Sequence, residues 1–209
     1  MANYRRLTKG LDRNAVVDLN DAWHHARKIG RPLNMLVTLR PLDIDDIASE
    51  DRTLVWRRLL NKLGAYARYR GFGPFTAAWA RESNPDGSGE HLHVLMHVPA
   101  KHREHFELTV YGWYHGASEI DVRVRHQVTS FTADGRRKNA IGYITKQMTP
   151  QASYRRGVIR RRGGPILGKR AGCTTNIGFK ARALWQAADR PPLPPSAHDV
   201  AAPARRKVA

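Results

Sequence analysis

The sequence predicts an α+β fold with a central antiparallel β-sheet and helices packed mainly on one face of that sheet. The first observation is that strand-like and helix-like hydrophobic patterns follow one another as β-α-β-β-α-β-α over residues 33–150. The second is the turn-forming run Ser-Asn-Pro-Asp-Gly-Ser-Gly at residues 83–89, between the second and third strands. Such a run closes a β-hairpin, so the two strands that it joins are expected to be antiparallel neighbours.

The N-terminal part is expected to contain a helix, a strand and a second helix. The helix at residues 13–29 carries spaced apolar residues and is followed by Gly30, a common helix stop. The strand at 33–40 is a short apolar run that ends at Pro41. Apolar residues at helical spacing then predict the helix at 52–70.

Strands and helices continue along the rest of this region. Pro150 ends the last helix, because the residue before a proline avoids helical backbone angles. The expected elements are strands at residues 75–82, 90–99 and 119–128 and helices at 101–115 and 139–148.

Composition divides the chain into four regions. Residues 1–32 are expected to form an N-terminal helical extension, and residues 33–150 the α+β domain. Residues 151–188 are expected to form a basic extension that binds DNA, because 151–182 contain nine Lys or Arg and no acidic residue. The run Arg-Pro-Pro-Leu-Pro-Pro and the Ala- and Pro-rich end predict a disordered basic tail at 189–209.

The overall composition favours a nucleic-acid partner. Lys and Arg number 36 against 18 acidic residues, a formal charge of +18, and the sequence pI is near 10.9. Neutralising phosphates releases counterions, which drives association with a chain of this charge. Cys173 is the single cysteine, so no internal disulfide is possible. With neither a membrane-spanning apolar run nor a secretory signal, the protein is expected to be cytoplasmic and to have no membrane partner.

The strongest chemical signal is the segment His91-Leu92-His93. Side chains alternate between the two faces of a strand, so both histidines point from one face, roughly 6–7 Å apart. At this spacing two imidazoles can converge on one metal ion. The apolar residues that alternate with them fill the opposite face and supply the core contact.

A third metal ligand is expected, because two imidazoles leave a divalent ion under-coordinated. Glu82 ends the strand that the hairpin places beside the histidine strand, and its carboxylate is the hard oxygen ligand that Mg²⁺ or Mn²⁺ prefers. Glu90 is the alternative ligand, although strand alternation points it to the face opposite His91. The expected site is therefore Mg²⁺ or Mn²⁺ held by Glu82, His91 and His93.

Tyr143 and Lys146 lie three residues apart on an expected helix and therefore share a face. A tyrosine hydroxyl can attack a phosphodiester, but its pKa near ~10 makes it a poor nucleophile at neutral pH. A metal on the phosphate oxygens and a nearby ammonium both lower that barrier. Gly142 leaves room beside the tyrosine for a DNA backbone. Three other tyrosines lack a lysine three residues later: Tyr111, Tyr114 and Tyr154.

The order of these motifs resembles that of the HUH endonucleases, and more narrowly the single-tyrosine initiators of rolling-circle replication. The resemblance covers residues 33–150 and rests on Leu-Val-Thr-Leu-Arg-Pro at 36–41, His-Leu-His at 91–93 and Gly-Tyr-Ile-Thr-Lys-Gln at 142–147. It implies the HUH-endonuclease fold and a metal-dependent enzyme that nicks single-stranded DNA through a 5′-phosphotyrosine. It also implies Tyr143 as the nucleophile, with Lys146 assisting its positioning. The carboxylate ligand corresponds to the family by position only.

The resemblance further implies a plasmid or phage replicon, with single-stranded or hairpin DNA at its origin as substrate and a host helicase as partner. Gln147 stands where a second tyrosine would lie, which favours a dimer on DNA. Thr38 and Arg40 are expected to form the floor of the DNA path, or else an ordinary core strand. Two alternative functions remain: a transposase of the same superfamily that acts on palindromic repeats, and a basic nucleic-acid-binding protein without catalysis.

Overall fold

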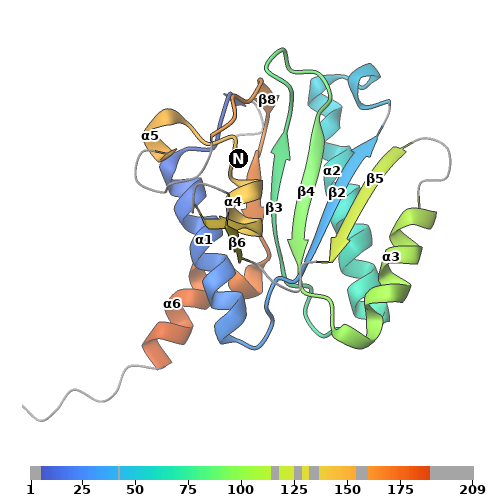
Figure 1. The fold of residues 1–209 in the computed structure, drawn as a ribbon, viewed down its shortest axis with the longest axis vertical. Coiled ribbons are helices and arrows are strands. Elements are labelled where there is room, and N and C mark those ends of the chain that lie inside the picture. The colour runs from blue at the N-terminus through green and yellow to red at the C-terminus, as the bar shows by residue number, and fades with distance from the viewer. Residues whose placement is uncertain are drawn as a thin grey trace, which may run out of the picture.

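The structure is a computed structural model that describes residues 6–41, 43–113, 118–124, 129–131, 137–153 and 160–188. Its centre is a five-stranded sheet with the spatial order β5-β2-β4-β3-β9 (Figure 1). Neighbouring strands in this sheet are antiparallel throughout. The strands, in that order, are Ser118–Val124, Met35–Pro41, His91–Met96, Ala77–Glu82 and Ala171–Cys173. The expected combination of helices with an antiparallel sheet is confirmed.

The hairpin between β3 and β4 forms as expected. Glu82 pairs with His91, and Ala80 pairs with His93. Gly89, in the connecting turn, has a φ of +59°, a conformation that glycine adopts without steric cost. Its backbone N–H donates to the Asp45 carboxylate at 2.8 Å, which ties the turn to the segment that precedes α2.

Helices cover both faces of the sheet, so the expectation that they pack mainly on one face is wrong. On one face lie α2 (Ser49–Tyr69) and α3 (Arg103–Gly112), and on the other lie α1 (Arg13–Lys28) and α4 (Ala140–Ile144) (Figure 1). The reason is that β2 is apolar on both sides: Val37 packs in the α2 core, whereas Leu36 packs in the α1 core. A strand with apolar side chains on both faces is stable only when both faces are covered.

Segments expected to be extensions are built into this fold. At the N-terminal side, β1 (Leu7–Thr8) pairs with β8 (Ile166–Leu167). At the C-terminal side, β9 pairs with β3 at the edge of the main sheet. Ile177 is fully buried among α1 residues, and α6 (Phe179–Ala188) packs against α1. The described parts of residues 1–32 and 151–188 therefore belong to the same folded unit as residues 33–150.

Shorter elements complete the described chain. The expected helix at 139–148 is α4 followed by turns, and the expected strand at 119–128 is described only as far as Val124. The expected disordered tail at 189–209 lies outside the described residues. The remaining elements are the 3₁₀ helices Ile44–Asp46, Ala100–His102 and Thr175–Ile177, the paired strands β6 (Thr129–Phe131) and β7 (Arg137–Asn139), and α5 (Pro150–Ser153). Among the helices described, none is long and apolar enough to cross a lipid bilayer.

Candidate metal centre and tyrosine site

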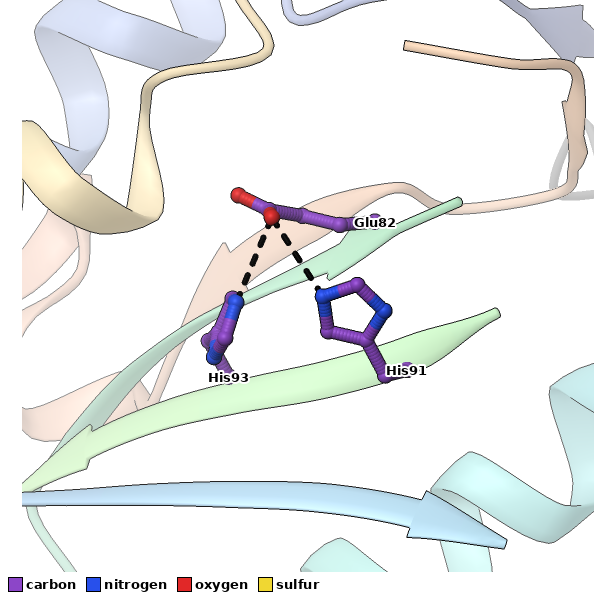
Figure 2. A group of neighbouring side chains, drawn as sticks. All are labelled: Glu82, His91 and His93. Atoms are coloured by element: carbon purple, nitrogen blue, oxygen red, sulfur yellow. Dashed lines mark hydrogen bonds and ion pairs between the residues drawn. The ribbon is translucent and has the colours of Figure 1, made fainter. Parts of the chain in front are cut away.

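Strand β4 presents His91 and His93 on the same face of the sheet. Leu92, between them, is fully buried in the core on the α2 side, so alternation directs both imidazoles toward the α1 and α4 side. The two ring centroids lie 4.8 Å apart. Figure 2 shows both rings turned toward the carboxylate of Glu82 on the neighbouring strand.

Glu82 completes a cluster of three possible metal ligands. Its Oε2 atom lies 3.4 Å from Nε2 of His91 and 3.2 Å from Nε2 of His93 (Figure 2). One ligand atom from each of these residues lies within 4.8 Å of the others. Glu82 is only 1% exposed, so its charge is held inside the protein. The structure thus brings together the three residues expected to bind a metal.

Hydrogen bonds behind the histidines orient their Nε2 atoms toward this cluster. The Nδ1–H of His91 donates to the carbonyl of Gly89 at 2.9 Å. Nδ1 of His93 lies 2.8 Å from Oγ1 of Thr38, on the neighbouring strand β2. When Nδ1 carries the proton, the Nε2 lone pair is free to bind a metal, and such supporting bonds are typical of metal-binding histidines. Thr38, expected as part of a DNA path, therefore supports His93.

The cluster has the chemistry of a divalent-cation site. In the neutral His91 ring, the Nε2 lone pair faces the Glu82 carboxylate, and a cation beside these two acceptors stabilises their contact. The other carboxylate oxygen, Oε1 of Glu82, is buried and has no hydrogen-bond partner among the described residues. One carboxylate with two imidazoles is a ligand set that divalent transition metals accept, and Mn²⁺ is among them.

Glu90, the alternative ligand, lies on the opposite face of the sheet. Its Oε1 accepts hydrogen bonds from Arg81 at 2.7 Å and from Trp56 at 2.5 Å, inside the α2 core. Glu90 and Arg81 are each only 2% exposed. Strand alternation therefore separates the two carboxylates as expected: Glu82 faces the histidines, and Glu90 belongs to a buried ion pair.

Tyr143 and Lys146 lie directly beside the histidine–carboxylate cluster. The Tyr143 ring centroid is 5.0 Å from that of His93. The Lys146 Nζ atom lies 3.8 Å from the Tyr143 ring centroid and 3.3 Å from Nε2 of His93. It also forms an ion pair with Oε2 of Glu82. Residues from two motifs about fifty positions apart in the sequence therefore form one site, and Tyr143 is 42% exposed at its surface.

The start of α4 determines where the tyrosine points. Asn139 caps this helix by accepting a hydrogen bond from the Gly142 backbone N–H at 2.6 Å. Ile141 and Ile144 are buried in the core beside α1. These apolar residues face inward. Tyr143 lies between them in the sequence and therefore points outward, to the edge of the site.

Electrostatics favour an ionised Glu82 and a neutral His93. Burial by itself raises the pKa of Glu82, but its contacts with His91 and His93 and the charge of Lys146 outweigh it, so this pKa lies well below its ordinary value. Burial lowers the pKa of His93. An anionic carboxylate beside a neutral imidazole is the protonation state that a metal ligand set requires.

Three exposed arginines lie next to the lysine of this site. The backbone N–H of Arg161 donates to the carbonyl of Lys146 at 2.8 Å, and the Nε of Arg160 donates to the carbonyl of Met148 at 2.9 Å. Arg160, Arg161 and Arg162 are all exposed. From the sequence, this run is recognised only as part of a basic region. A run of arginines does not indicate which other segment of the chain it contacts.

Gln147 has a structural role that the sequence did not indicate. Its Oε1 accepts from Arg170 at 2.6 Å, and its Nε2 donates to the carbonyl of Ser83 at 2.8 Å. The side chain is buried, and so is Arg170. These bonds attach the turn after α4 to the end of β3, immediately beyond Glu82.

Of the three other tyrosines considered from the sequence, the structure places Tyr111 away from this site. Tyr111 is exposed on α3, which packs on the opposite face of the sheet. Tyr114 and Tyr154 lie outside the described residues.

Comparison with known protein families, with curated proteins and with solved structures finds no match to this chain.

Proposed function

We propose that this protein is an HUH endonuclease that nicks single-stranded DNA through a 5′-phosphotyrosine and initiates rolling-circle replication of a plasmid or phage. The observation that carries the proposal is the position of Tyr143 and Lys146 against His93 and Glu82. A tyrosine at a protein surface is ordinary. A tyrosine beside a lysine, two imidazoles and a buried carboxylate has the groups that phosphoryl transfer requires.

Glu82, His91 and His93 would hold Mg²⁺ or Mn²⁺, which supplies charge stabilisation at the non-bridging oxygens of the phosphate when it is bound. The protein contributes a fixed set of ligand atoms. The bonds of His91 to Gly89 and of His93 to Thr38 hold the rings in place, and β-sheet pairing holds Glu82 opposite His91.

Tyr143 is the proposed nucleophile. Its hydroxyl oxygen attacks the phosphorus of a phosphodiester, the bond from phosphorus to the 3′-oxygen breaks, and that oxygen takes up a proton to leave as a 3′-hydroxyl. The phenol proton passes to solvent. Lys146, with its ammonium 3.8 Å from the tyrosine ring centroid, stabilises the developing phenolate and phosphate charge. In the reverse step, a 3′-hydroxyl attacks the phosphotyrosine and regenerates the phenol, which joins two strands.

The charge around the site fits a polyanionic substrate. Arg160, Arg161 and Arg162 are exposed beside the backbone of Lys146, and the whole chain carries a formal charge of +18. A DNA strand that places one phosphate at Tyr143 would extend along these guanidinium groups, which bind phosphate in a bidentate geometry.

Covalent capture tests the proposal. Wild-type protein, Tyr143→Phe and the control Tyr111→Phe are incubated with Mn²⁺ and a pool of single-stranded and hairpin oligonucleotides, and the products are separated under denaturing conditions. We expect an adduct that retains a 3′-end label with wild type and Tyr111→Phe and none with Tyr143→Phe. Non-covalent binding of the pool should be the same for all three proteins, because phenylalanine keeps the ring and loses only the attacking oxygen.

Two outcomes would contradict the proposal. An adduct of Tyr143→Phe equal to that of wild type would assign the nucleophile to another residue. DNA binding by the wild type without any adduct, with Mn²⁺ or Mg²⁺ present, would indicate a nucleic-acid-binding protein that does not cleave.

A further inference from the structure

Lys146 shares its binding partners with the metal-ligand cluster. Its ammonium pairs with Oε2 of Glu82, the carboxylate oxygen that both histidine Nε2 atoms approach. It also lies 3.3 Å from Nε2 of His93. The lysine side chain is only 12% exposed, so the surrounding residues hold its ammonium at the cluster.

The cluster holds a single negative charge. Glu82 supplies it, and the two histidines contribute none when they are neutral. A divalent cation and the Lys146 ammonium at the same oxygen would place three positive charges against one negative charge, in a partly buried environment where charges interact strongly. Both cations therefore cannot occupy their best positions at once.

We propose that Lys146 is a built-in competitor of the divalent cation, and that a phosphate group at Tyr143 relieves the competition by drawing the ammonium away from Glu82. The inference rests on the metal centre in the proposed function. Since Nζ already lies 3.8 Å from the Tyr143 ring centroid, a phosphate positioned for attack by this tyrosine lies within reach of the ammonium. Metal and nucleic acid then bind cooperatively, and each raises the affinity for the other to the same extent.

Mn²⁺ titration calorimetry tests this competition without measuring cleavage. The proteins are wild type, Lys146→Met, Lys146→Gln and the control Lys101→Met, whose lysine is exposed in the Ala100–His102 turn. Without DNA, we expect both Lys146 variants to bind Mn²⁺ about tenfold more tightly than wild type, a difference of about 1.4 kcal/mol. Lys101→Met should match wild type. Thermal unfolding of each protein checks that the variants are folded.

The second half of the experiment adds a saturating oligo(dT) strand. We expect the strand to tighten Mn²⁺ binding to the wild type and to close most of the gap between wild type and the Lys146 variants. Metal contacts to phosphate would tighten Mn²⁺ binding in every protein. The contribution of Lys146 is therefore measured by the difference in Mn²⁺ affinity between wild type and the Lys146 variants.

The outcomes separate this inference from the proposed function. Equal Mn²⁺ affinity of wild type and folded Lys146 variants, or weaker binding by the variants, would overturn the competition and leave the metal centre standing. Absence of Mn²⁺ binding in all four proteins would overturn both. A gap that oligo(dT) leaves unchanged would overturn the role of phosphate.

Discussion

Glu82 and His91 pair directly across the β3–β4 hairpin, and their ligand atoms, Oε2 and Nε2, lie 3.4 Å apart. Residues directly opposite in an antiparallel pair have Cβ atoms about 4.5–5.5 Å apart, so the pairing of the hairpin places these two side chains next to each other. His93, two residues farther along, reaches the same carboxylate oxygen from the same face. Because sheet pairing holds the site in place, replacing a metal ligand should lower the metal affinity. Replacing a residue on the opposite face of the sheet should instead lower the free energy of unfolding.

The two carboxylates of the hairpin offer a matched test of that separation. We expect Glu82→Gln to lose Mn²⁺ affinity by more than the roughly 10–100-fold typical of removing a supporting residue, since it removes a ligand itself. Glu90→Gln should keep most of the Mn²⁺ affinity and lower the free energy of unfolding by about 3–5 kcal/mol, because Arg81 loses its charged partner in the core. Titration calorimetry and denaturant unfolding measure the two effects. The reverse ranking of Mn²⁺ affinities would make Glu90 the ligand.

The hydrogen bond behind His93 predicts a smaller effect on metal binding. Thr38→Val keeps the shape of the side chain and removes the Oγ1 that lies 2.8 Å from Nδ1 of His93. We expect Mn²⁺ affinity to fall about tenfold, in the range reported for such supporting residues. Thr109→Val, on α3 at the opposite face of the sheet, is the control and should leave the affinity unchanged. If both variants bind Mn²⁺ as wild type does, the Thr38 bond does not orient the imidazole.

The core of the site was predictable from local rules. Alternation along a strand placed His91 and His93 together, and the short turn placed Glu82 beside them. Lys146 was expected near Tyr143 from helical spacing. Its contact with Glu82 was not, because it depends on how α4 packs against β4, and that packing involves segments about fifty residues apart.

The edge strand and the second helical layer were harder to predict. β9 is the short segment Ala-Gly-Cys, which has no hydrophobic period of its own and is a strand because it pairs with β3. A Cβ at Gly172 would lie 2.9 Å from the Trp79 ring, so the close pairing requires a glycine there. Ala78 and Ala80 on β3 are small enough for α1 to approach that face. Such complementarity between distant segments is not visible in either segment alone.

The exposed arginines beside Lys146 predict a measurable electrostatic contribution to DNA binding. Replacing Arg160, Arg161 and Arg162 together with glutamine should weaken binding of single-stranded DNA and reduce the salt slope by up to about 2, at roughly 0.7 per lost phosphate contact. This substitution changes charge without removing a strand, whereas deleting the chain after residue 150 would also remove β9 from the sheet.

A control triple variant removes three exposed cations on the α2 side of the molecule. Arg58, Arg68 and Lys101 are changed to glutamine, which gives the same loss of net charge at a distance from the site. Fluorescence anisotropy over a range of salt concentrations gives both slopes. Equal slopes for the two triple variants would mean that only net charge matters and that Arg160–162 make no specific phosphate contact.

The buried position of Gln147 limits how the proposed nicking cycle can be completed. A second tyrosine in the same subunit would be expected one turn after Tyr143, yet residue 147 is turned inward and bonded to Arg170 and Ser83. Among the residues that the structure describes, one subunit therefore offers one tyrosine at this site, and we expect a second nick to require another subunit once Tyr143 is a phosphotyrosine. We expect wild-type protein to make a second covalent cleavage only as a dimer on DNA. Adding Tyr143→Phe subunits should lower the yield of the second adduct in proportion to mixed dimers, as measured on doubly labelled DNA. Two successive cleavages by a strictly monomeric preparation, without strand rejoining, would contradict this prediction.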